Sequence, residues 1–150
     1  DNATVIGDVK MGDECSLWFQ TVVRGDVNSI RIGDRVNVQD GSILHVSYEK
    51  HDLRIGNNVS IGHRAIVHGC EVEDEVLIGM GSTVMDGAII RKHCVIAAGA
   101  VVLEETECES GWIYAGIPAK KVKEVPDELR TELIRRTASH YAKYASWYMD

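Results

Sequence analysis

The sequence predicts a mainly β fold, and three observations lead to that prediction. The 150 residues include 18 Val and 14 Ile against 7 Leu, and aromatic residues make up only 6%. β-Branched side chains favour strands over helices. Apolar residues recur with a period of six, and small residues recur at a fixed offset from them. The chain length fits one domain, so we expect residues 1–150 to form a single domain.

The six-residue period covers most of the chain. It includes a slip of three residues after Val23, an excursion of five residues after Leu44, and the loss of one residue after Val67. Its apolar positions are Val5, Met11, Leu17, Val23, Ile32, Val38, Leu44, Ile55, Ile61, Val67, Val72, Ile78, Val84, Ile90, Ile96, Val102 and Cys108. The alternative, an ordinary β-sandwich, predicts two-residue alternation with turn clusters every 8 to 12 residues.

Small or β-branched residues stand four places after most of these apolar positions: Val9, Cys15, Thr21, Val27, Val36, Ser42, Val59, Ala65, Val76, Ser82, Ala88, Cys94, Ala100 and Thr106. Gly12, Gly33, Gly56, Gly62 and Gly79 directly follow an apolar position, where we expect a tight turn with positive φ. The pattern resembles the hexapeptide-repeat proteins. That resemblance implies a left-handed parallel β-helix, a triangular prism with three hexapeptides per coil, over about residues 5–110.

The composition changes after Cys108, because six of the nine aromatic residues lie beyond Gly111: Trp112, Tyr114, Tyr141, Tyr144, Trp147 and Tyr148. Pro126 and Asp127 form a candidate helix N-terminus, and the apolar spacing that follows is helical. We predict one C-terminal helix over about residues 127–148, packed along the prism.

Charge and cysteine content exclude several classes of function. The net charge of -7 disfavours nucleic-acid binding, and no apolar run approaches the roughly 18 residues that span a membrane. Cys15, Cys70, Cys94 and Cys108 form no CxxC pair, which argues against a zinc ribbon. We expect buried thiols in a reducing compartment, the cytoplasm. The chain opens at Asp1 without a Met, which leaves room for a preceding leader or coil.

Three histidines fall at informative positions in the repeat. His45 and His68 are 23 residues apart, and subtracting the five-residue excursion leaves 18, one full coil. Adjacent coils lie about 4.8 Å apart, so the two imidazoles can reach a common ion. His63 falls on the neighbouring face. A third nitrogen from another subunit would complete the open three-nitrogen arrangement of catalytic zinc, which predicts a closed trimer. The alternative is that all three are surface histidines.

Other polar residues fall in the same columns. Arg24 lies one coil before His45 once the slip is subtracted, and Asp40 lies one coil before His63. Gln39 adjoins Asp40, and Asp26 adds a second carboxylate. In a trimer, the column of Arg24, His45 and His68 would then face the column of Asp40 and His63 of the next subunit.

The strings Arg24-Gly25-Asp26, Gln39-Asp40-Gly41 and Ile61-Gly62-His63, with His45 and Val67-His68-Gly69, resemble the gamma-class carbonic anhydrases. The resemblance implies a homotrimer in which His45, His63 and His68 bind Zn2+, or Fe2+ or Co2+ as in relatives, with His63 donated by the adjacent subunit. It implies metal-bound hydroxide that attacks CO2 to give bicarbonate. Gln39 resembles the residue that orients water or CO2, and Arg24, Asp26 and Asp40 resemble an interface ion-pair network.

The chain also departs from that family. The long acidic loop with its proton-carrying glutamate is replaced by residues 46–52, where Glu49 or His51 could exchange protons, and Val27 replaces a carboxylate. Three alternatives therefore remain open. They are a metal-dependent esterase or thioesterase, a metal-binding homologue without turnover, and a hexapeptide acyltransferase, which shares the segment around Pro118.

Overall fold

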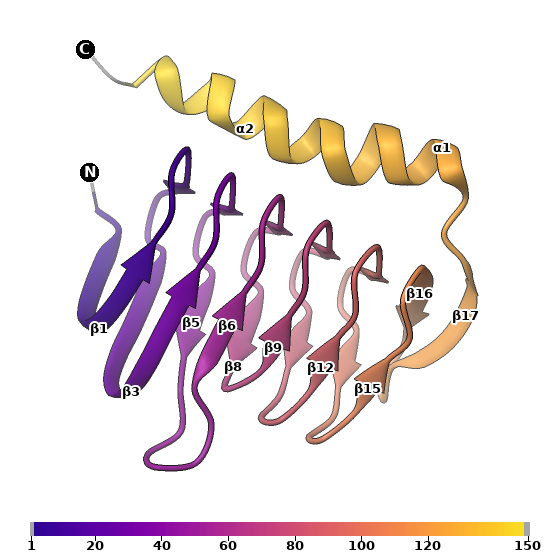
Figure 1. Cartoon of the computed structure of the whole chain (residues 1–150), viewed down its shortest axis with the longest axis horizontal. Helices are drawn as coiled ribbons and strands as arrows, with labels where there is room; N and C mark the ends of the chain where they lie inside the picture. Colours follow the sequence, from indigo (N-terminus) through magenta and orange to yellow (C-terminus); the bar gives the residue numbers. More distant parts are fainter. Residues whose placement is uncertain (1, 149–150) are drawn as a thin grey trace.

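The chain winds as a left-handed parallel β-helix with a helical segment along one side (Figure 1). The computed structural model describes residues 2–148. Each coil contributes short strands to three faces of a prism, and the coils stack through parallel strand pairs. The fold predicted from the six-residue period is confirmed.

One sheet wraps two of the three faces because β1 (Thr4–Met11) and β3 (Val22–Ile32) bend through a corner. The first half of β3 pairs with β5 and the second half with β6. The histidine face contains β5 (Ile43–His45), β8 (Ile66–His68), β11 (Thr83–Val84) and β14 (Val101–Val102). The charged face contains β6 (Leu53–Ile55), β9 (Glu71–Val72), β12 (Ile89–Ile90) and β15 (Glu107–Cys108).

The second sheet forms the third face, which we call the helix face. It contains β2 (Ser16–Leu17), β4 (Asn37–Val38), β7 (Ser60–Ile61), β10 (Leu77–Ile78), β13 (Val95–Ile96) and β16 (Trp112–Ala115). After β16 the chain reverses, and β17 (Lys120–Glu124) pairs with it antiparallel.

The core of the prism is built from the predicted inward positions. Every one of them from Val23 to Cys108 is buried. Leu17 is half-buried, and Val5 and Met11 are exposed because no coil of residues 2–148 covers the first coil. Burial of each Val, Leu or Ile side chain contributes about 1.5–3 kcal/mol, so the stacked interior holds the coils in register.

The corners of the prism correct one prediction. The prediction of positive φ is wrong at all five glycines: Gly12, Gly33, Gly56, Gly62 and Gly79. A Cβ at Gly79, for example, would lie 2.5 Å from the amide nitrogen of Ala98 in the next coil. Close approach between coils therefore requires these glycines. The left-handed position falls two residues after each of these glycines, at Glu14, Arg35, Asn58, Arg64 and Gly81.

The irregularities of the repeat become local features. The slip lies inside β3, and the register between β1 and β3 shifts between Gly7 and Val9. The excursion is a small loop between β5 and β6 that protrudes from the prism, and Ser47 and His51 pair across its base (Figure 1). Of the four cysteines, Cys15 is half-buried and the others are buried, and all four are free thiols. Burial raises the pKa of Cys108 to about 12.

The C-terminal helix begins at the predicted residue but differs in detail. It comprises α1 (Asp127–Leu129), a π-helical turn (Arg130–Arg135) and α2 (Arg136–Ser146), so it ends two residues before the predicted end. Pro126 precedes the first turn with an extended backbone, and no side chain caps the helix. Ile134 packs against Val95 of the helix face. Within residues 2–148, the helices are too short or too polar to cross a membrane.

Candidate metal centre

His45 and His68 lie side by side at the ends of β5 and β8. Parallel pairing places Arg24, His45 and His68 in one row, one coil apart, as the repeat arithmetic predicts. Nδ1 of His45 lies 2.9 Å from Nε2 of His68. Their side chains are only 17% and 32% exposed. The main-chain register therefore forms a pair of imidazole nitrogens that face each other.

The remaining ring nitrogen of each histidine faces a carboxylate. Nε2 of His45 lies 3.1 Å from Asp26, whose second oxygen accepts a hydrogen bond of 2.5 Å from Arg24. Hydrogen bonds from Arg24, and to a lesser extent from His45, hold the pKa of Asp26 below its usual value. Nδ1 of His68 hydrogen-bonds to Asp86. The ring nitrogens that face each other share a hydrogen bond in this structure, and a bound ion would replace that bond.

Asp86 is a site residue that the sequence reasoning missed. Ser47 of the excursion loop donates a hydrogen bond of 2.5 Å to its second oxygen. Burial acts to raise the pKa of Asp86, but the hydrogen bonds from Ser47 and His68 outweigh burial and lower it. The spacing held a signal, because one coil is 17 residues where the repeat loses one residue, and this count places Asp86 one coil after Gly69, the residue that follows His68.

His63 stands apart from the pair, in the turn between β7 and β8. Its Nδ1 lies 2.8 Å from Asp40, and its side chain is 42% exposed. No three His, Cys, Asp or Glu side chains of a single chain converge on a metal position within residues 2–148. The separation of His63 from His45 and His68 agrees with the coil arithmetic.

Gln39 lies in a buried polar row on the helix face and is not a solvated edge residue. Its Nε2 donates to Asn37 at 3.0 Å, and Asn37 donates to Ser60 at 2.8 Å. The neighbouring residue Asp40 carries the contact to His63. Gln39 and His63 are therefore linked through adjacent backbone, and no contact joins Gln39 to His45 or His68 among the described residues.

An aromatic hollow of about 310 Å³ opens beside His63 and Asp40. Its aromatic lining comes from the first coil and from the C-terminal helix: Trp18, Phe19, Tyr141, Tyr144, Trp147 and Tyr148. The rings of Trp18 and Tyr141 meet edge to face with centroids 5.2 Å apart. Burial, together with the charge of Asp40, raises the pKa of Tyr141. The sequence placed most of these aromatics in the closing helix but not at His63.

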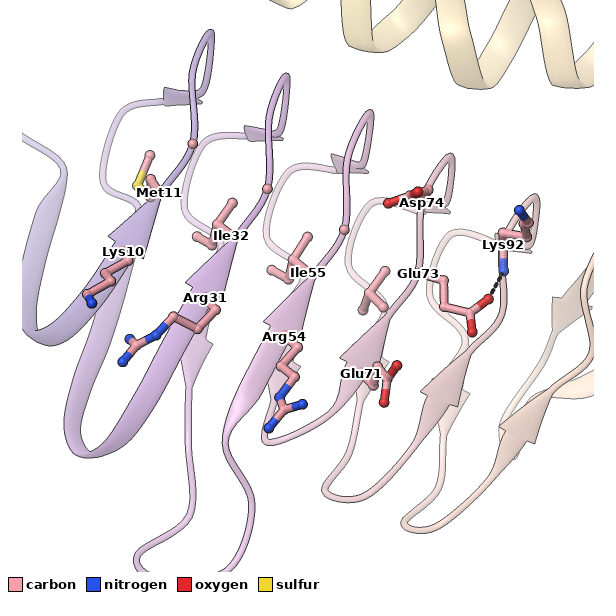
Figure 2. Close-up of a pocket in the computed structure, with 14 residues that line it drawn as sticks. Lys10, Met11, Arg31, Ile32, Arg54, Ile55, Glu71, Glu73, Asp74 and Lys92 are labelled. Carbon is pink, nitrogen blue, oxygen red and sulfur yellow. Dashed lines mark hydrogen bonds between the residues drawn. The ribbon is translucent and has the colours of Figure 1, made fainter.

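A larger hollow, about 750 Å³, lies on the charged face, and none of the three histidines lines it. Figure 2 shows Lys10, Arg31 and Arg54 aligned on successive coils, with acidic residues further along. Arg31 and Arg54 are each already paired, with Asp8 and Asp52 at 2.8 Å. The cations of this hollow are thus largely neutralised by their own chain.

The histidine face carries an exposed apolar row beside the pair. Ile43 and Ile66 are 41% and 38% exposed, two residues before His45 and His68 on the same strands. They are in register with Val22, Thr83 and Val101. The row can bury its apolar surface against a second subunit and so bring that subunit next to the pair.

The donor set suits a divalent metal. Imidazole nitrogens bind zinc, iron and other transition metals, and a carboxylate on the far ring nitrogen is the usual partner of a metal-binding histidine. All three histidines have such a carboxylate: Asp26, Asp40 and Asp86. The residues present therefore fit a three-histidine site shared between chains.

The chain is similar to hexapeptide-repeat proteins and to proteins named as carbonic anhydrases. Residues 69–104 match the family described as bacterial transferase hexapeptide (six repeats). The chain is 44% identical to gamma carbonic anhydrase 1, mitochondrial, of Arabidopsis thaliana over 96% of its own length, but it spans only about half (54%) of that protein. It is 42% identical to a carbonic anhydrase of Geobacillus kaustophilus, covering 96% of this chain and 80% of that one.

A solved structure has nearly the same fold. The crystal structure of a suspected acetyltransferase from Bacillus cereus matches with a TM-score of 0.94 and 40% identity, covering 97% of this chain and 84% of that one.

Proposed function

The chain belongs to the gamma carbonic anhydrase family of hexapeptide-repeat proteins, and we propose from that membership that it is a metal-dependent carbonic anhydrase that acts as a homotrimer. His45 and His68 of one subunit and His63 of the next would bind the ion, Zn2+ or alternatively Fe2+ or Co2+. The observation that carries the proposal is the facing pair of imidazoles, 2.9 Å apart, with His63 on a separate corner.

When bound, a divalent ion would lower the pKa of a water molecule to about 7 and so supply hydroxide at neutral pH for attack on CO2. The residues of the chain provide the surroundings for that step. Asp26 and Asp40 hold the outer nitrogens of His45 and His63, and Arg24 fixes Asp26. Gln39, adjacent to Asp40, would orient CO2 or water. The product would be bicarbonate.

A proton must leave the site, and the excursion loop offers two carriers. Glu49 lies at the exposed tip of the loop. Nε2 of His51 is buried and lies 3.3 Å from Glu105, so this nitrogen is shielded from solvent. We therefore favour Glu49 as the residue that passes protons to solvent, because a proton carrier must reach water.

Mixed trimers test whether the site is shared between subunits. His63→Ala and His45→Ala chains should each lose metal binding as pure trimers. In trimers refolded from an equal mixture, about one site in four combines an intact His63 from one chain with an intact pair from its neighbour, as cyclic symmetry requires. We expect about a quarter of the wild-type zinc content and of the CO2 hydration rate.

The control is a mixture of His45→Ala with His68→Ala chains, in which no site recovers both members of the pair. Absence of metal recovery in the first mixture, with trimers confirmed by light scattering, would refute a shared site. Absence of divalent metal from wild-type trimers would refute the proposed function as a whole.

A second candidate is hydrolysis of an ester or thioester by the same metal site. The aromatic hollow beside His63 favours it, because about 310 Å³ is more space than CO2 occupies. A screen of aryl and acyl esters and thioesters on the zinc-loaded protein distinguishes the two. A metal-binding protein without turnover would fail both assays. A hexapeptide acyltransferase would bind coenzyme A, which a competition assay detects.

The cysteines and the net charge bear on where the protein acts and on what it binds. The free thiols favour a reducing compartment, and we propose the cytoplasm, although the plant relative is named as mitochondrial. We propose a small-molecule substrate and no nucleic-acid partner, since the net charge of -7 disfavours binding to phosphates.

A further inference from the structure

We propose that Asp86, clamped by Ser47 of the excursion loop, is a positioning residue that fixes the ring of His68 and thereby sets the affinity of the site for its metal. The proposal rests on the proposed function, in which His68 is a ligand. It goes beyond the ligand set and the Arg24, Asp26 and Asp40 network, none of which includes the excursion loop.

The two oxygens of Asp86 have separate partners. Oδ1 accepts from Nδ1 of His68, and Oδ2 accepts from Oγ of Ser47 at 2.5 Å. Asp86 is only 23% exposed, so water competes weakly for these contacts. With both oxygens occupied, the carboxylate can rotate little, and the imidazole plane of His68 is held with it.

Ser47 is itself held by two backbone contacts. Its amide donates to the carbonyl of His51 at 3.0 Å, and its carbonyl accepts from the side chain of Asn28 at 3.2 Å. Asp86 therefore receives support from a loop that closes on itself and is anchored to β3. The loop length and the histidine orientation are coupled through this single carboxylate.

Gly69 provides an independent sign that the approach of Asp86 is built into the chain. A Cβ at Gly69, the residue after His68, would lie 2.6 Å from Oδ1 of Asp86. Its φ of +47° also requires a residue that tolerates the left-handed region. A side chain at this position would displace the carboxylate from His68.

The chemistry follows from the two nitrogens of imidazole. A neutral ring carries one N–H and one lone pair, and a carboxylate that accepts from Nδ1 leaves the lone pair on Nε2, which faces His45. Loss of such a carboxylate partner typically weakens metal binding 10- to 100-fold. Without Asp86, His68 would exchange between tautomers and ring orientations.

The test compares three variants of the full trimer: Asp86→Asn, Ser47→Ala and, as a matched control, Asp52→Asn. Asp52 ends the same loop, and its carboxylate pairs with Arg54 and not with His45 or His68. Zinc affinity is measured by competition with a chelator. We expect 10- to 100-fold weaker binding for Asp86→Asn, about 2- to 10-fold weaker for Ser47→Ala, and wild-type affinity for Asp52→Asn.

A metal-free measurement separates this proposal from the proposed function. Long-range ¹H–¹⁵N NMR of the zinc-free protein should show His68 protonated at Nδ1 in the wild type and a mixture of tautomers in Asp86→Asn. Wild-type zinc affinity and an unchanged tautomer in Asp86→Asn would overturn the proposal and leave the proposed function standing. If the wild type bound no zinc, the proposed function would fail, and the tautomer alone would decide the role of Asp86. If Asp86→Asn did not fold, Ser47→Ala would carry both measurements.

Discussion

The two histidine-bearing corners of the prism differ in what holds them. At the corner after β5 and β8, strand register places His45 and His68 one above the other, and both side chains are largely shielded. At the corner before β8, His63 projects from a turn, is more exposed and contacts one carboxylate, Asp40. One chain alone forms the pair at the first corner. At the second corner, His63 can join a metal site only if another subunit brings its pair next to it.

The histidines of the proposed site are therefore positioned in two different ways. The pair inherits its geometry from backbone hydrogen bonds and from the buried residues beneath it, Leu44 and Val67. The position of His63 relative to the pair depends on the contact between subunits. Folding alone should therefore form the pair, and assembly should form the site.

The largest effect should come from breaking the contact between the corners. Ile66→Asp places a charge in the exposed apolar row, where burial against a neighbour would leave it unpaired. We expect monomers at micromolar concentration and a loss of zinc affinity greater than about 100-fold, since a first-sphere ligand is lost as well as orientation. Sedimentation and chelator competition measure the two effects.

The matched control is Ile89→Asp, which introduces the same charge on the outward side of the charged face, in register with Glu71 and Glu107. This variant should remain trimeric and retain zinc. A trimeric Ile66→Asp variant with normal zinc binding would show that the apolar row is not the interface.

The next effect should come from loosening the pair within one subunit. Leu44→Ala removes a fully buried side chain beside His45 and should lower the free energy of unfolding by about 2–5 kcal/mol. Phe19→Ala, at the other corner, removes a partly exposed ring and should cost only about 1 kcal/mol. Urea denaturation at fixed protein concentration measures both. Equal losses would contradict the contrast between the corners.

The smallest effect should come from the carboxylate of His63. Asp40→Asn removes the charge that holds Nδ1, but solvent reaches this corner, so we expect zinc binding only about 10-fold weaker, the lower end of the range for such partners. Asp127→Asn, a neutralisation at a 96% exposed side chain, serves as control and should not alter affinity. A larger loss in Asp40→Asn than in Asp86→Asn would reverse the ranking of the two corners.

The repeat explains which parts of the site were predictable. Register in a β-helix is a count of residues, so the stacking of Arg24, His45 and His68 follows from their spacing once the slip and excursion are subtracted. The same counting, with the lost residue subtracted, places Asp86 one coil after Gly69 and so next to His68. Spacing alone, however, does not distinguish a carboxylate turned toward a ring from one turned toward water. Its contact with Ser47 depends on how the excursion folds, which no periodicity describes.

The six-residue period does not predict the aromatic hollow or the reason for the corner glycines. The aromatic hollow requires Tyr141 to meet Trp18, and the segment that joins the prism to the helix has no repeat from which its path could be counted. The sequence predicts glycine at the corners, but for positive φ and not for close approach. It shows that a small residue is needed there, but it does not show which atom of the next coil would meet a Cβ.

The left-handed corner residues have a practical consequence. Among the described residues, nine non-glycine positions adopt positive φ, Arg64 and Glu75 among them. Apart from Asn58, each such residue carries about 1–2 kcal/mol of backbone strain that asparagine or glycine would relieve. The stacked interior offsets this strain, coil after coil. Exposed corners distant from the histidines are therefore a reserve of thermal stability, available to engineering without any change to the faces that assemble the site.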